Sequence, residues 1–426
     1  MTSTSNCIIS LRRHDLDNLR TFLTGLVIVH HTAIAYGAVG GHPVQSALAK
    51  LAFPQATIPL TLLVALNQSF FMGLFFWISG HVSAQSLERI DGDPARTRWH
   101  FIHSKCLRLG LPAILYTLVV HPFLSLISPH EWTLGAAASR LSHYFSTLRG
   151  VRGVVWYTAN LLVLDVAAAC WKTRPGLGAE TNEKKGLSAT KNIDKAPSWY
   201  TLLARHGWIA TAGLSFVTRL YYPVGVTIKL TGLQPAYAPQ YVLAYIIGHA
   251  SIQEERRAKS CSSRCCGLGE SSTPLARAIS MSLLTVPAIW LPYLFRREAG
   301  QDWFVAAVRD SSGGWNATAL LYAIWNEFSF ITIGPALVSH FSRWHNRPAT
   351  FTLFQPRYSY GAFLVHMVVI VTAEVALDSV LAYHSSVWKW LGPSALTVGV
   401  GAVNVCASFG LAKVLLDKFP FLRRII

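Results

Sequence analysis

Long apolar stretches alternate with short polar segments along the whole chain. A helix needs about 20 residues to cross the hydrocarbon core of a bilayer, and most of these stretches approach that length. The pattern predicts an all-α integral membrane protein, a polytopic bundle of about ten transmembrane helices. The predicted spans are residues 20–38, 60–84, 107–127, 153–171, 207–225, 238–252, 277–295, 316–340, 358–377 and 392–415.

Composition supports the membrane class. Of the 426 residues, 52% are hydrophobic and 13% are charged, whereas about 25% of the residues in an ordinary soluble domain are charged. We therefore expect one transmembrane domain over residues 1–426. Two polar segments, at about 172–198 and 253–274, contain too few apolar residues to fold alone, and we expect them to be mobile cytosolic loops.

The basic residues predict the topology. A net charge of +17 could indicate a nucleic-acid partner, but these residues gather at the N-terminus and in every second loop, as the positive-inside rule describes. We therefore expect a lipid bilayer as the partner, no nucleic acid, and both termini in the cytosol. We expect the protein to reside in an endomembrane, such as that of the endoplasmic reticulum, or in the plasma membrane. The cysteine cluster Cys261, Cys265 and Cys266 lacks zinc-site spacing, so no metal site is predicted.

The first span carries the best candidates for chemistry. Arg20 and His31 are eleven positions apart, which is close to three helical turns, so they share one face with a rise of about 16 Å between them. Arg20 would lie at the cytosolic interface, where a cation can hold a phosphate, and His31 near the middle of the membrane, where it can act as a base. A snorkelling arginine and a hydrogen-bonded histidine are the structural alternative. His30 is about 100° around the helix and should point elsewhere.

Arg219 is a second unusual residue because it lies within an apolar span. An unpaired charge there is costly, so Arg219 must meet an acid, water or a ligand. The candidate acids are Asp165, Glu327 and Glu374. A buried ion pair that fixes the helix register and a contact with a bound substrate both remain open.

Several segments together resemble the acyltransferase 3 family of membrane O-acyltransferases, including its glucan-modifying and fungal branch. Leu16 to Arg20 and then His31 match the family pattern of an arginine, ten residues and a histidine. The other similar segments are Phe75–Gly80, Phe101–Pro112, Ser215–Gly225 and Tyr358–His366, which follow the family order over nearly the whole chain.

The resemblance implies ten core helices, an acyl-CoA donor that enters from the cytosol, and a pocket open to the cytosol around His31. In that scheme His31 is the catalytic base. It accepts the proton of an acceptor hydroxyl while the hydroxyl oxygen attacks the thioester carbonyl. Arg20 would bind or orient the donor, and Asp17 would orient Arg20. A base must be neutral, and burial disfavours the charged form of histidine.

The resemblance also suggests contacts for the coenzyme. Lys105 and Arg108 stand where the family has two arginines three residues apart. A lysine can bind phosphate as a point charge but lacks the bidentate fork of arginine. Anchoring at the cytosolic interface is the alternative for both residues.

Four further residues match family positions. Arg219 would contact the coenzyme or the acceptor, and Glu327 matches an acidic position of the branch. Trp156 opens the fourth span, where the family has an aromatic pair, although the ordinary interfacial belt explains it as well. His366 resembles a recurrent family position and is expected to be structural.

The expected activity is transfer of acetyl from acetyl-CoA, a donor substrate rather than a resident cofactor, to a hydroxyl of a small natural product made in secondary metabolism. A glycan or lipid acceptor is one alternative. A membrane transporter is the alternative from another class, but transporter folds often contain internal repeats, and the sequence shows none.

Overall fold

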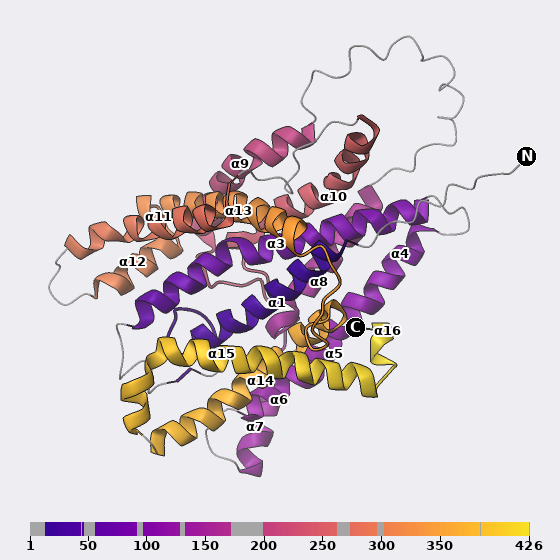
Figure 1. Ribbon diagram of the computed structural model, residues 1–426. Helices are drawn as coiled ribbons and strands as arrows, with labels where there is room; N and C mark the ends of the chain where they lie inside the picture. The colour runs from indigo at the N-terminus through magenta and orange to yellow at the C-terminus, as the bar shows by residue number, and fades with distance from the viewer. Residues whose placement is uncertain are drawn as a thin grey trace, which may run out of the picture.

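The computed structural model describes residues 13–43, 45–46, 56–91, 97–127, 133–171, 199–261, 273–295, 302–383 and 385–425. The regular structure in these residues is helical throughout, which confirms the all-α prediction. In Figure 1, α1 (His14–Ala35) and α3 (Thr57–Asp91) run through the middle of the bundle. Helices α14 (Pro356–Tyr383) and α15 (Ser385–Lys418) cover one side of them, and α11 (Leu275–Phe295) lies on the other.

The third predicted span, residues 107–127, is part of a longer helical rod that begins at Arg98 and has two irregular turns. The rod contains α4 (Arg98–Lys105), α5 (Leu111–Leu115) and α6 (His121–Ile127), joined by the π-helical turns η2 (Cys106–Gly110) and η3 (Tyr116–Val120). Single π-helical turns are rare in proteins overall, and those that occur often lie at functional sites. The remaining helices are α7 (Leu134–Ser146), α8 (Trp156–Trp171), α9 (Trp199–Tyr221), α10 (Ala238–Cys261), α12 (Trp303–Ser312), α13 (Ala317–Trp344) and α16 (Leu422–Ile425), with short 3₁₀ turns at η4 (Gly153–Val155) and η8 (Pro235–Tyr237).

Two glycines allow α3 and α10 to pack closely along their length. A Cβ atom at Gly80 would collide with the carbonyl oxygen of Tyr245, and one at Gly248 would collide with that of Trp77. Small residues at such crossings let helix backbones approach within a membrane. This contact forms the central seam against which α1 and α13 pack.

The chain is a multi-pass integral membrane protein. Seven helical stretches in the described residues are long and apolar enough to cross a bilayer: Thr57–Asp91, Arg98–Leu124, Gly153–Trp171, Leu275–Phe295, Ala317–Trp344, Pro356–Asp378 and Gly392–Lys418. The other three predicted spans correspond to α1, α9 and α10, which carry more polar residues. Helix α1 tolerates them because it is surrounded by α3, α13, α14 and α15.

The sixth predicted span, residues 238–252, is longer in the structure. The segment expected to be a mobile loop from residue 253 continues α10 to Cys261. Its residues Gln, Glu, Arg, Ala and Lys favour helix, so low hydrophobicity alone was a poor guide to its structure. The rest of that loop up to residue 272, and the predicted loop at 172–198, lie outside the described residues.

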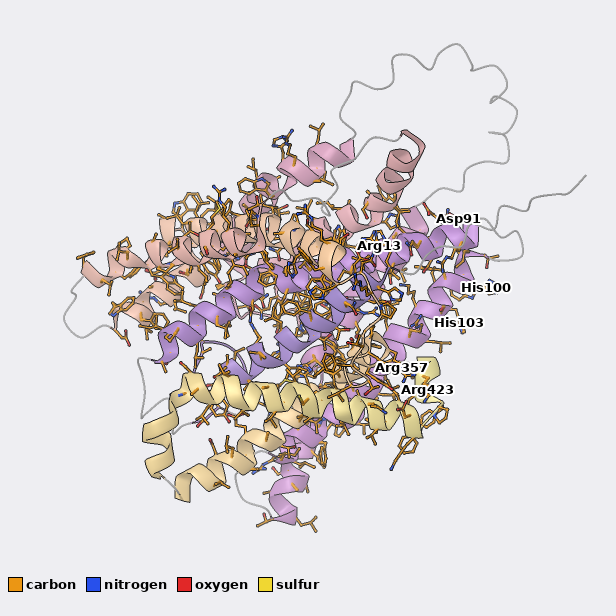
Figure 2. All side chains as sticks on the ribbon, in the orientation of Figure 1. Arg13, Asp91, His100, His103, Arg357 and Arg423 are labelled. Carbon is orange, nitrogen blue, oxygen red and sulfur yellow. The ribbon has the colours of Figure 1, made fainter. Side chains whose placement is uncertain are left out.

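Charged side chains from distant parts of the chain gather at one end of the bundle. Figure 2 labels Arg13 before α1, Asp91 at the end of α3, His100 in α4, Arg357 in α14 and Arg423 in α16, all at that end. The predicted topology assigns this end to the cytosol.

Candidate active site

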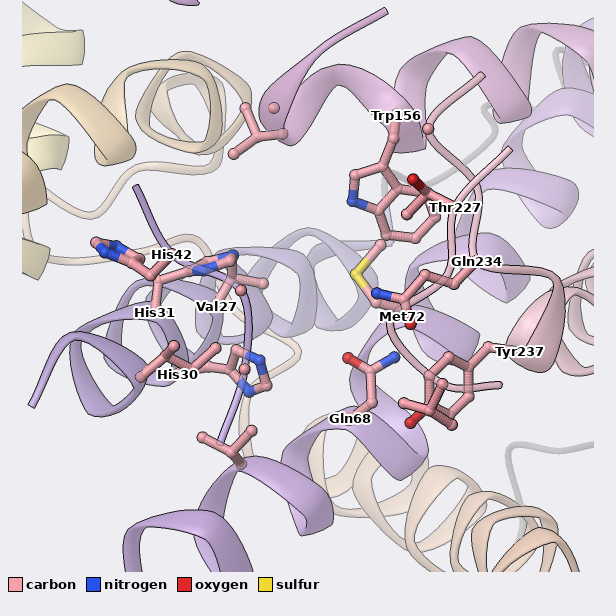
Figure 3. Close-up of a pocket in the computed structure, with 18 of the residues that line it drawn as sticks. Val27, His30, His31, His42, Gln68, Met72, Trp156, Thr227, Gln234 and Tyr237 are labelled. Carbon is pink, nitrogen blue, oxygen red and sulfur yellow. The ribbon is translucent and has the colours of Figure 1, made fainter. Parts of the chain in front are cut away.

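A cavity of about 540 Å³ lies where α1, α3, α8 and α14 meet. Sites for small molecules commonly have volumes of roughly 300–1,000 Å³. In Figure 3, His30 and His31 lie on one side of it, and Trp156, Gln234 and Tyr237 lie across from them. The cavity therefore has an imidazole side and a side of aromatic rings and amides.

His31 lies one turn before the end of α1 and is a partly buried residue. Its Nδ1 atom is buried and has no hydrogen-bond partner in the described part of the chain. His30 also lines the cavity, with its ring 5.4 Å from that of His31. The expectation that His30 points elsewhere is wrong, because the cavity follows the curve of the helix and residues 100° apart both reach it.

Two more imidazoles complete this side of the cavity. The ring of His366 lies 5.3 Å from that of His31, and the ring of His42 lies 6.2 Å from it. His366 Nδ1 is 2.6 Å from the carbonyl oxygen of Phe363, so this nitrogen donates the hydrogen bond and Nε2 is left as the acceptor of the neutral ring. His42 Nδ1 is 3.7 Å from Glu374 Oε2. Imidazole nitrogens are thus the groups here that can take a proton from a bound molecule.

The cavity reaches the surface at the end of the bundle opposite Arg20. Its exposed lining residues come from the loop after α1, the turn before α8 and the loop after α9: Val39, Gly40, Gly41, Pro43, Gly153 and Thr227. The predicted topology places these loops on the non-cytosolic side. The sequence predicted a pocket around His31 that opens to the cytosol. His31 borders this cavity, but the exposed lining residues lie on loops that the predicted topology assigns to the other side.

Arg20 lies outside the cavity lining, at the other end of α1. Its side chain is 39% exposed, and one guanidinium nitrogen donates to Asp17 Oδ1 at 3.3 Å. Arg20 Nε is buried without a hydrogen-bond partner in the described residues. The expected pairing of Asp17 with Arg20 is therefore present.

Arg108 is exposed in η2, and its carbonyl oxygen accepts a hydrogen bond of 3.2 Å from Tyr360.

Lys105 is occupied by partners inside the protein. Its ammonium lies 2.8 Å from Asp165 Oδ2 and donates to Ser83 Oγ at 2.8 Å. Tyr245 donates to the other oxygen of Asp165 at 2.7 Å. Asp165, one of the acids considered for Arg219, therefore pairs with Lys105 instead.

Arg219 is fully buried, and its three guanidinium nitrogens have no hydrogen-bond partner among the described residues. The guanidinium carbon lies 5.3 Å from the ring centre of Tyr237 and 5.1 Å from that of Tyr322, and both rings line the cavity. Glu327 is close enough to interact with Arg219 electrostatically, but no carboxylate of a described residue lies within 4 Å of it. Arg219 therefore supports the cavity wall from behind.

Glu327 is also fully buried and does not line the cavity. Asn326 donates to Glu327 Oε1 at 3.0 Å. Trp156 does line the cavity, with its ring 5.7 Å from that of Tyr241. Of the sequence candidates, His31, Trp156 and His366 therefore line the cavity. Arg219 lies behind its wall, and Asp17, Arg20, Lys105 and Arg108 lie toward the charged end.

Sequence reasoning missed the far wall. Gln68 and Tyr241 line it together, and Gln68 Nε2 donates to the Tyr241 hydroxyl at 2.9 Å. Gln234 lies beside them and accepts a hydrogen bond from the backbone N–H of Gly225 at 3.2 Å. These uncharged residues come from separate helices and a loop, and no local pattern marks them. Among the described residues, no group of three or more His, Cys, Asp or Glu side chains could hold a metal ion.

Fold and site together define a polytopic membrane protein with an imidazole-lined cavity for a small molecule. The chain belongs to the acyltransferase 3 family, whose model, described as an acyltransferase domain, matches residues 13–413. No curated protein and no solved structure matches the chain. The protein is thus a membrane acyltransferase that uses an acyl donor.

Proposed function

We propose that the protein transfers an acetyl group from acetyl-CoA to a hydroxyl of a small natural product, with His31 as general base. The observation that carries the proposal is the position of His31. Its imidazole borders a cavity of about 540 Å³ and lies on the same helix as Arg20, which occupies the opposite end of the bundle. A base and a phosphate-binding cation at the two ends of one helix suit a long donor with a reactive group at its tip.

In the proposed reaction, neutral His31 takes the proton of the acceptor hydroxyl while the hydroxyl oxygen attacks the thioester carbonyl. The tetrahedral intermediate then collapses, the bond from carbon to sulfur breaks, and the acetyl ester is released. His31 returns its proton to the departing sulfur, so the products are the ester and CoA with a free thiol. General base catalysis by a positioned side chain contributes about 10²–10⁴-fold.

Donor and acceptor approach from opposite ends in this scheme. Arg20 and Arg108 bind the phosphates of acetyl-CoA at the charged end, with Asp17 orienting Arg20. The acceptor enters between the loops that carry Gly40 and Thr227. Lys105, already engaged with Asp165, holds α4 against α8.

The reaction can be tested with purified protein in detergent and acetyl-labelled acetyl-CoA. The acceptor panel contains hydroxylated polyketides, terpenoids, a glycan and a lipid alcohol, and the donor panel adds propionyl-CoA and palmitoyl-CoA. We expect label in an ester of a natural-product acceptor and an equal amount of free CoA. Transfer from palmitoyl-CoA alone would contradict the acetyl assignment, and transfer only to the glycan or the lipid would contradict the acceptor class.

A further inference from the structure

The cavity lining ends part-way along α1, α3 and α14 and at the first residue of α8. The last lining residue toward the charged end is Val27 on α1, Met72 on α3, Trp156 on α8 and Phe363 on α14. On each of these helices, the residues of the next turn toward the charged end are not part of the lining. The cavity containing His31 is therefore closed on the side that faces Arg20.

Three aromatic rings form the closure. Phe75, Tyr157 and Phe363 contact one another in all three pairs, with ring centres 5.7 Å apart for Phe75 and Tyr157, 5.8 Å for Tyr157 and Phe363, and 6.3 Å for Phe75 and Phe363. Their exposed fractions are 5%, 8% and 6%. We call these residues the aromatic layer. Ring centres 4.5–7 Å apart are typical of packed aromatic pairs.

One polar interaction fixes the layer. The Tyr157 hydroxyl shares a hydrogen bond of 2.7 Å with Ser79 Oγ and donates to the Phe75 carbonyl oxygen at 3.3 Å. Ser79 is only partly buried and lies on the side of the layer away from the cavity. The hydroxyl thus links α8 to α3 beneath the rings.

The charged end of the bundle begins directly below the layer. Arg20 is close enough to Tyr157 to interact with it electrostatically, and so is Tyr360 of α14. Tyr360 is in turn bonded to the carbonyl oxygen of Arg108. The layer therefore separates the residues proposed to hold the donor phosphates from His31.

We propose that Phe75, Tyr157 and Phe363 form a gate that admits the thioester to His31 and excludes the water of the acceptor cavity from the donor side. The proposal rests on the proposed function for the direction from which the donor arrives. A gate is needed because His31 can take a proton from water as well as from a hydroxyl. If water attacked the thioester carbonyl in place of the acceptor hydroxyl, acetyl-CoA would be hydrolysed to acetate and CoA, with one proton released. While it is closed, the layer keeps the thioester away from His31 and from this water, and so limits hydrolysis.

The first test measures the barrier without any donor. A Met72→Cys reporter just above the layer is placed in a chain whose seven native cysteines are serine, and a membrane-impermeant thiol reagent is added to the Arg20 side of sealed vesicles. A closed gate is open in a minor state of about 0.1–10%, so Phe363→Ala should raise the labelling rate by about tenfold or more. Phe75→Ala should do the same, while Tyr157→Phe, which keeps the ring, should label more slowly than either. Phe304→Ala removes a ring of similar burial, 5% exposed, that contacts Trp290 and Trp303 rather than the layer, and this variant should label as the parent does.

The second test measures acetyl-CoA hydrolysis without acceptor. Phe363→Ala should release CoA and acetate faster than wild type, and adding His31→Ala should abolish the increase. Labelling of Met72→Cys that is equal in Phe363→Ala, Phe75→Ala and the parent would overturn the gate, whatever the hydrolysis shows. Raised labelling in a protein that never releases CoA from any acyl donor would establish the barrier and contradict the proposed reaction instead.

Discussion

Arg20 and His31 share a helix but have different surroundings. His31 faces three other imidazoles at the cavity, whereas Arg20 is partly exposed beside Asp17 at the charged end. A group that takes part in proton transfer should affect turnover, and a group that only holds the far end of the donor should affect affinity. The two residues can therefore be separated by kinetics.

We predict that Arg20→Ala raises the KM for acetyl-CoA with little change in kcat. A hydrogen bond to a charged group is worth about 1.5–3 kcal/mol, which corresponds to roughly 10–100-fold in affinity. Arg20→Lys should recover part of the loss because it keeps the charge. Steady-state kinetics at saturating acceptor measure this, and an unchanged KM in Arg20→Ala would make Arg20 only a topological anchor.

Arg219 is predicted to stabilise the cavity wall rather than bind the coenzyme. Arg219→Met removes the stacking on Tyr237 and Tyr322, and a desolvated cation–π contact is worth about 2 kcal/mol. We expect a lower melting temperature in detergent and an unchanged KM for acetyl-CoA. A raised KM with unchanged melting would instead support the contact with coenzyme phosphates.

At the scale of helices, one buried ion pair joins α4 to α8. Lys105 of α4 and Asp165 of α8 are 2.8 Å apart, and Asp165 is fully buried. Removing one partner of such a pair leaves an uncompensated buried charge and costs about 3–5 kcal/mol. The pair therefore fixes α4 against α8 more than it offers a charge to a ligand.

We predict that Lys105→Met lowers the melting temperature strongly and that Lys105→Met with Asp165→Asn recovers most of the loss. The asparagine oxygen can still accept the hydrogen bond of Tyr245, so the double variant leaves that hydroxyl satisfied. Thermal unfolding of the detergent-solubilised variants provides the comparison. If Lys105→Met melts as wild type but binds acetyl-CoA weakly, the lysine serves the coenzyme.

Hydropathy placed the long helices because each span is a local property of about 20 residues. It did not predict α7 and α12, which are too short to cross a bilayer. The shared face of Arg20 and His31 was equally local, since it follows from helical geometry. The partner of Lys105 could not be predicted, because it is 60 positions away on another helix and Asp165 was equally available to Arg219. The far wall of Gln68, Gln234 and Tyr241 depends on how α3, α10 and a loop pack, which no periodicity encodes.

At the scale of the whole molecule, the bundle is divided into two compartments. One is the charged end, where Arg13, Arg357 and Arg423 gather. The other is the cavity, whose exposed lining residues lie at the opposite end. His31 borders the second compartment and shares α1 with the first, so both substrates of a transfer can meet at this helix.

The most direct test of this account compares acceptor-dependent CoA release from acetyl-CoA in wild type, His31→Ala and His30→Ala. The two histidines are adjacent on α1 and both line the cavity, so each substitution removes the same ring from nearly the same place. We predict that His31→Ala loses about 10²–10⁴-fold in kcat, the contribution of a general base, with unchanged melting, and that His30→Ala loses far less. Substantial turnover in His31→Ala, or equal losses in the two variants, would contradict the assignment of His31 as the base.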